Sequence, residues 1–74
     1  MNRQPENFPE LVKEVRRQLG LTQGELAHAL GVSFATVNRW ENGKTKPSKL
    51  AQRQFKTFCD QKASQGLLVI GGDE

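Results

Sequence analysis

The stretch "LTQGELAHALGVSFATVNRWENG", residues 21–43, has the most restrictive spacing in the chain. It contains two short segments with apolar residues at helical intervals, one on each side of Gly31. Thr22, with Glu25 three residues later, is typical of a capping box that starts the first helix, and Ser33 can cap the second. Helices this short are marginal in isolation, so the two must pack against each other and against their neighbours.

Two small residues predict that these helices cross at a large angle, as in a helix-turn-helix. Gly31 can adopt the positive φ of a sharp turn, and Ala27 lies four residues earlier, where the following helix passes closest. The apolar residues expected to seal the corner are Leu26, Leu30, Val32, Val37 and Trp40. The alternative is an ordinary helical hairpin in a small bundle.

A helix is also predicted on each side of this pair. Asn7 and Glu10 indicate a capping box, followed by Val12, Val15 and Leu19 at helical spacing up to Gly20. After the loop "GKTKP", residues 43–47, Ser48 can cap a longer helix. One face of that helix, which we expect to close the core, carries Ala51, Phe55, Phe58 and Cys59.

These patterns divide the chain into three parts. Residues 1–6 are expected to be flexible, residues 7–64 to form the domain with its helix-turn-helix at 22–42, and residues 65–74 to form a tail. The tail contains four consecutive apolar residues, and a small strand, a packed arm and a linker are all compatible with it. With 74 residues there is room for one domain with a small core.

The net charge of +3 is unevenly distributed. Residues 39–56 carry six basic side chains against one acidic side chain, a local excess of +5. Such an excess favours an anionic partner for the middle of the chain.

Other functional classes find little support in the residues. We expect no enzyme, because no paired carboxylates, no nucleophile with a partnered histidine and no phosphate-binding glycine loop can be identified. His28 has no second metal ligand near it, so neither a metal nor a cofactor is expected. The single cysteine and the absence of a signal or membrane-spanning pattern favour a cytoplasmic location with no membrane association.

Residues 21–48, "LTQGELAHALGVSFATVNRWENGKTKPS", strongly resemble the lambda-repressor-like, Cro-type helix-turn-helix family, also called the xenobiotic-response-element (XRE) family. The matching elements are "LTQ", "ELA", "LGVS", "TV", "RWENG" and the following proline. The resemblance implies an all-α bundle of four to five helices that binds double-stranded DNA with its third helix in the major groove. Many relatives have two short helices after the proline, whereas this sequence indicates one long helix.

The predicted recognition helix, residues 34–42, supplies the candidate base contacts. Its residues Val37 and Trp40 should point inward, which leaves on or beside the outward face Phe34, Ala35, Asn38 and Arg39. Arg39 can bond guanine with two hydrogen bonds, Asn38 can pair with adenine, and small or apolar groups can touch a thymine methyl. A solvated charge or a phosphate contact is the alternative for Arg39, and a partly packed aromatic ring the alternative for Phe34.

Candidate phosphate contacts surround this helix. They are Gln23, Ser33, Thr36, Asn42, Lys44, Thr45 and Lys46. Free amides and the positive dipole end favour an anion where Gln23 starts its helix, and the resemblance places a glutamine against the DNA backbone there. A solvated run of charge is the alternative for the loop lysines, and Lys49 and Arg53 extend the same stripe.

Glu41 would be repelled by phosphates, so it needs a different role. The resemblance implies that it pairs with Arg16 of the first helix, the two forming a structural pair that ties the recognition helix to the scaffold.

The leading hypothesis is a sequence-specific DNA-binding transcriptional regulator. The alternative is a protein-interaction adaptor or a toxin-binding antitoxin with the same fold. We also expect a homodimer on a two-fold operator with half-sites ~34 Å apart. Candidates for the surface that pairs are Phe58, the apolar arm at residues 67–70 and a further domain.

Overall fold

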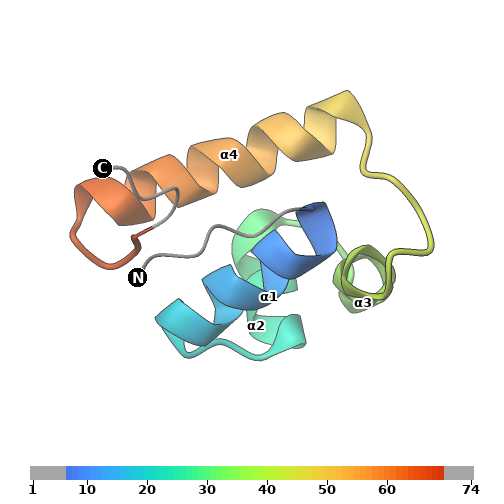
Figure 1. Cartoon of the computed structure of the whole chain (residues 1–74), viewed down its shortest axis with the longest axis horizontal. Coiled ribbons are helices and arrows are strands. Elements are labelled where there is room, and N and C mark those ends of the chain that lie inside the picture. Colours follow the sequence, from blue (N-terminus) through green and yellow to red (C-terminus); the bar gives the residue numbers. More distant parts are fainter. Residues whose placement is uncertain (1–6, 70–74) are drawn as a thin grey trace.

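The described part of the computed structural model, residues 7–69, forms four α-helices and contains no strand (Figure 1). The helices are α1 (Phe8–Leu19), α2 (Gln23–Leu30), α3 (Phe34–Asn42) and α4 (Lys49–Ser64). The predicted all-α, lambda-repressor-like class is confirmed, and residues 49–64 form a single long helix. The expectations for residues 1–6 and 70–74 lie outside the described residues.

Local capping explains where the helices begin. The Thr22 hydroxyl accepts from the Glu25 amide at 3.0 Å, and the Glu25 carboxylate accepts from the Thr22 amide at 2.9 Å, so the predicted capping box is complete. At α1, the Asn7 side chain accepts from the Glu10 amide at 3.0 Å. The Glu10 carboxylate instead lies 3.6 Å from Lys13 Nζ. Of the two hydrogen bonds of a capping box, α1 therefore has the one accepted by the Asn7 side chain.

Gly31 ends α2 with a φ of 77°. A Cβ atom at this position would meet no other atom within 4 Å. The turn therefore requires glycine for its left-handed backbone and not for lack of room.

The core lies where α1 crosses α3 and where α4 lies across the other helices (Figure 1). Its buried apolar residues are Val12, Val15, Leu26, Ala27, Val37, Trp40, Phe55, Phe58, Cys59 and Leu68. Phe8, Trp40 and Phe55 form edge-to-face pairs with centroids 5.3–6.5 Å apart. Phe58 is only 8% exposed, so it is part of the core and does not offer a free surface for pairing two copies.

Residues after α4 return to the bundle. Leu68 is 3% exposed, although Leu67 and Val69 on either side of it are exposed. The Gln18 carboxamide donates to the Val69 carbonyl and accepts from the Val69 amide, both at 2.8 Å. As far as Val69 the tail is thus an arm packed on α1.

None of the helices within residues 7–69 has both the length and the apolar character needed to cross a bilayer.

Candidate nucleic-acid interface

An ion pair fixes α3 against α1. Arg16 donates from Nε to Oε2 of Glu41 at 2.5 Å and from Nη2 to Oε1 at 2.9 Å. Its third nitrogen, Nη1, donates to the carbonyl of Leu21 at 3.1 Å. The Glu41 side chain is only 4% exposed and that of Arg16 is 26% exposed, so this pair, which the resemblance implied, is partly buried. One guanidinium therefore joins α1, the chain before α2, and α3.

Glu41 stays ionised despite its burial. Burial by itself would raise the pKa of this carboxyl. Hydrogen bonds from Arg16 and Gln23, together with the positive charges of Arg16 and Lys13, outweigh that effect and hold the pKa below its ordinary value. The hydrogen bonds that Arg16 donates to Glu41 raise the pKa of Arg16. The negative charge near the recognition helix is thus neutralised inside the protein.

Three of the four candidate base contacts are open to solvent. Phe34 is 56% exposed, and Ala35 and Arg39 are exposed on the same helix. No ion pair within residues 7–69 engages Arg39. The outer face of α3 thus presents an aromatic ring, a methyl group and a guanidinium.

Asn38, the fourth candidate, is half-buried in a hydrogen-bonded network. Its Nδ2 donates to Gln23 Oε1 at 3.2 Å, and its Oδ1 accepts from Asn42 Nδ2 at 3.0 Å. Gln23 in turn donates from Nε2 to Glu41 Oε1 at 3.0 Å. The structure therefore joins one candidate base contact to two candidate phosphate contacts, a link that the sequence analysis missed. Only the spacing of four residues between Asn38 and Asn42 signals any part of it.

Ser33 and Thr36 lie side by side at the start of α3. The Ser33 hydroxyl caps the helix by accepting from the Thr36 amide at 3.1 Å, and the two hydroxyl oxygens are 2.9 Å apart. Ser33 is exposed and Thr36 is half-buried.

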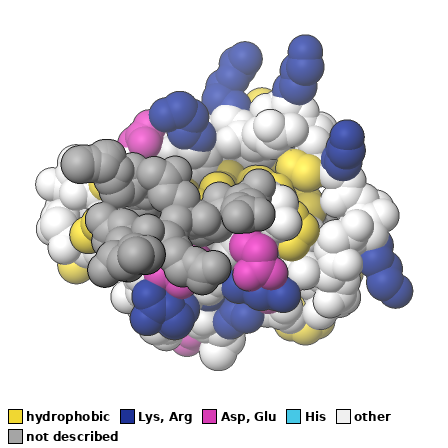
Figure 2. All heavy atoms as spheres, viewed as in Figure 1, with side chains coloured by type: hydrophobic (Ala, Val, Ile, Leu, Met, Phe, Trp, Pro, Cys, Tyr) yellow, Lys and Arg dark blue, Asp and Glu magenta, His cyan; other side chains and the backbone are white. Residues whose placement is uncertain are grey.

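The basic side chains fall into two groups. Those on α1 and Lys56 of α4 have acidic partners, Arg16 in its pair with Glu41 and the others in the pairs Lys13–Glu10, Arg17–Glu14 and Lys56–Asp60. Lys62 of α4 makes no ion pair within residues 7–69 and lies over the Phe58 ring. Those on α3, in the loop after it and at the start of α4 make no ion pair within residues 7–69: Arg39, Lys44, Lys46, Lys49 and Arg53. Figure 2 shows Lys and Arg side chains projecting from the edge of the molecule where α3 lies and α4 begins. The uncompensated positive charge is therefore concentrated around α3.

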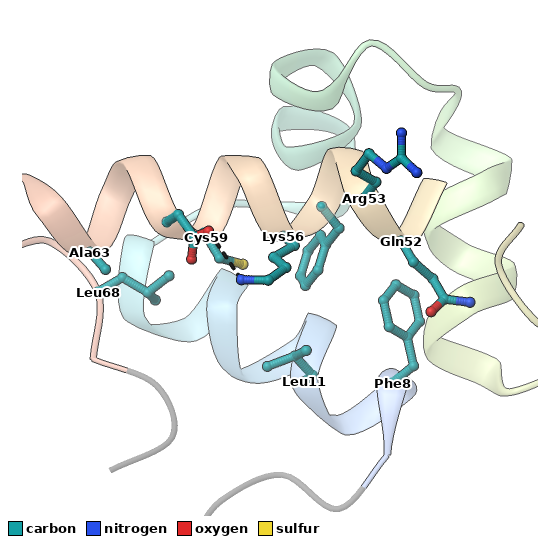
Figure 3. A pocket seen from close by; sticks show the side chains of 10 residues that line it. Phe8, Leu11, Gln52, Arg53, Lys56, Cys59, Ala63 and Leu68 are labelled. Carbon is teal, nitrogen blue, oxygen red and sulfur yellow. Dashed lines mark hydrogen bonds and ion pairs between the residues drawn. The ribbon is translucent and has the colours of Figure 1, made fainter. Parts of the chain in front are cut away.

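A groove of about 630 Å³ lies between α1 and α4. Its lining includes Phe8, Leu11, Lys56, Cys59 and Leu68 (Figure 3). Leu68 of the arm forms part of its wall.

No group of three or more His, Cys, Asp or Glu side chains within residues 7–69 is arranged to hold a metal ion. His28 is exposed.

Two short helices joined by a tight turn at Gly31, the second with Arg39 exposed, have the arrangement of a helix-turn-helix module. The family described as Helix-turn-helix matches residues 12–50, and the chain belongs to this family, in its XRE-type form. An uncharacterized HTH-type transcriptional regulator of Methanothermobacter thermautotrophicus is 30% identical over 63 residues, which cover 85% of this chain and 91% of that protein.

Two longer proteins are more similar over shorter stretches. The type II methyltransferase M1.ScrFI of Lactococcus lactis subsp. cremoris is 51% identical over 43 residues, and the type II methyltransferase M.SsoII of Shigella sonnei is 46% identical over 58 residues. These stretches are 54% and 74% of this chain but only 11% and 15% of the two methyltransferases. No solved structure matches the chain.

Proposed function

We propose that this chain is a sequence-specific, double-stranded DNA-binding transcriptional regulator that inserts α3 into the major groove. The observation that carries the proposal is the division of the basic side chains. The cations around α3 have no acidic partner within residues 7–69, whereas those on α1 and Lys56 of α4 are paired. Membership of the helix-turn-helix family and the similarity to HTH-type transcriptional regulators support the same function.

In this proposal Arg39 bonds to guanine O6 and N7, and Phe34 and Ala35 contact thymine methyl groups. Arg39 has the geometry for this role, because its side chain is exposed in the last turn of α3. The loop after α3 then lies along the DNA backbone, where Lys44, Thr45 and Lys46 contact phosphates. At the start of the two helices Gln23, Ser33 and Thr36 contact phosphates as well.

A pair of variants separates base contacts from phosphate contacts. Arg39→Ala should weaken binding by ~1–3 kcal/mol on the preferred duplex and relax the preference at one base pair. Lys44→Ala should weaken binding equally on all duplexes and reduce the slope of log K against log salt by about 1. Arg17→Ala is the matched control, because it removes one exposed positive charge that is paired with Glu14 on α1.

The experiment starts with selection of bound duplexes from a randomised pool, followed by fluorescence anisotropy at several salt concentrations. A motif and a steep salt dependence are expected. Absence of any salt-dependent DNA binding would refute the proposal and leave the adaptor or antitoxin alternative. Equal losses on preferred and random duplexes for Arg39→Ala would make Arg39 a phosphate contact.

We also propose that two copies bind a two-fold site with half-sites ~34 Å apart, because a module this small gains affinity by pairing. The spacing of half-sites in the selected motif tests this directly. A motif without two-fold symmetry would contradict it.

A further inference from the structure

Three carboxamides connect the buried carboxylate of Glu41 to the exposed end of α3. Asn42 donates to Asn38 at 3.0 Å, Asn38 donates to Gln23 at 3.2 Å, and Gln23 donates to Glu41 at 3.0 Å. The network crosses from α3 to α2 and back to α3, so it spans both helices of the helix-turn-helix.

The carboxylate sets the direction of the whole network. An ionised carboxylate can only accept hydrogen bonds, so Gln23 must turn its amino group towards Glu41 and its oxygen towards Asn38. Asn38 must then donate to that oxygen, and its own oxygen is left to accept from Asn42. Arg16, which can only donate, bonds to both oxygens of Glu41 and helps to keep it ionised, so the order does not reverse.

Each carboxamide of the network keeps one N–H group free. Each amide nitrogen has two hydrogens, and Gln23 and Asn42 each use one of them inside the network. Their second N–H groups remain for a phosphate oxygen. Asn38 likewise keeps one N–H and one acceptor position, but it is the member of the network that hydrogen-bonds to both other carboxamides. Its two hydrogen bonds therefore hold the amides of Gln23 and Asn42 in place.

We infer that Asn38 is a positioning residue that orients the amides of Gln23 and Asn42, the two amides proposed to contact phosphates. The inference rests on the proposed function, because it assigns a role within the same DNA-binding surface. Amides that are already ordered in the free protein lose little side-chain freedom on binding. Asn38→Ala frees both of them, so affinity should fall about tenfold, a change consistent with ordering two side chains on binding.

The first test measures Asn38→Ala against the wild-type chain on the selected duplex and on a random duplex. Positioning predicts the same fold-loss on both duplexes and an unchanged preference at every base pair. A loss confined to the selected duplex, with relaxed preference at one position, would show that Asn38 reads a base. Unchanged affinity on both duplexes would also overturn the inference. If the wild-type chain itself shows no salt-dependent binding, the proposed function fails before the variant is compared.

A double-mutant comparison separates positioning from general damage to the fold. Asn38→Ala should cause no further loss in a chain that already carries Gln23→Ala and Asn42→Ala, because no amides remain to be oriented. A persistent tenfold loss in that background would show that Asn38 acts in another way. Fluorescence of Trp40, which is 4% exposed and the only tryptophan, verifies that each variant is folded at the assay temperature.

NMR of the free protein gives a readout that needs no DNA. In the wild-type chain the side-chain amide groups of Gln23 and Asn42 should be rigid. In Asn38→Ala both should become mobile on the nanosecond timescale, with averaged chemical shifts. Unchanged mobility of both amides would contradict the inference even if DNA affinity fell.

Discussion

Replacing Arg16 by alanine should be one of the most damaging single changes to this fold. Glu41 accepts two hydrogen bonds from Arg16 and one from Gln23, and its side chain is 4% exposed. Arg16→Ala leaves a buried carboxylate with only the glutamine as partner. Breaking a buried ion pair in this way costs ~3–5 kcal/mol. Because the Arg16 side chain is 26% exposed, water can replace part of it, and we expect about 3 kcal/mol, the low end of that range.

A loss of this size is large for a chain of 74 residues, whose total stability is of the order of 4–11 kcal/mol. In a domain this small each 1 kcal/mol lowers the melting temperature by ~4–8 °C. Arg16→Ala should therefore melt ~12–24 °C below the wild-type chain.

The loss should also depend on pH. In the wild-type chain the pKa of Glu41 lies below its ordinary value of 4.5, so the pair contributes fully above pH 4.5 and is lost only as the pH falls through the lower folded value. Without Arg16, burial dominates and should raise the pKa of Glu41 above its ordinary value. At about pH 4 the carboxyl of the variant is then largely protonated, so the variant should lie closer to wild-type stability than it does at pH 7.

Urea unfolding followed by Trp40 fluorescence at pH 7 and about pH 4 measures both effects. Arg17→Ala is the control, since it breaks an exposed pair on the same helix and should leave the stability nearly unchanged. Adding Glu41→Gln to Arg16→Ala should restore part of the stability at pH 7 by removing the buried charge. A deficit for Arg16→Ala below about 1 kcal/mol, or one that does not change with pH, would refute the reasoning.

Other expected outcomes concern the arm, the thiol and the turns. Leu68→Ala should destabilise by about 2 kcal/mol in urea unfolding, and an unchanged midpoint would show that the arm is not held. Burial, with a smaller contribution from Asp60, raises the pKa of Cys59 to about 11. Alkylation at pH 8 should therefore be far slower in the folded than in the urea-unfolded chain, and equal rates would contradict this. Gly31→Ala should lower the melting temperature, because alanine in this left-handed backbone conformation is strained by about 1 kcal/mol. Gly24→Ala should raise the melting temperature slightly, because there is room for a methyl group at this position of α2. Changes of the same sign in the two variants would contradict the argument.

The helices were predictable because their signals are local. Each start depends on a hydroxyl or amide three residues before the backbone amide that it caps, as in Ser48 with Ala51. The ends at Gly20, Gly31 and Gly43 depend on a backbone conformation that glycine adopts easily. Both kinds of signal lie within one turn of helix, so no knowledge of the packing is needed.

The polar network was not predictable from such signals. Gln23 and Asn38 are 15 residues apart, and Gln23 and Glu41 are 18 apart. Their side-chain amides follow no periodic pattern. The sequence also does not distinguish an Asn or Gln that is exposed from one that belongs to a hydrogen-bonded network. The burial of the Glu41 side chain was not predictable either. The resemblance implies a partner for Glu41 but does not say how far the pair is exposed to water.

The arm presented a third kind of problem. Residues 67–70 are apolar, but Leu68 is buried while its two neighbours are exposed. Only the α1 residue Gln18, 51 positions away, shows why the chain is held in this register.

The way the arm is held has a practical consequence for fusions. Gln18 and Arg16 are two positions apart on α1 and so point about 200° apart around the helix axis. Arg16 faces α3, and Gln18 grips Val69 on the other side. A fluorescent protein or an enzyme joined beyond Val69 would therefore start from the side turned away from the recognition helix, and would leave the approach of a duplex unobstructed. The arm is therefore a suitable place at which to attach another protein.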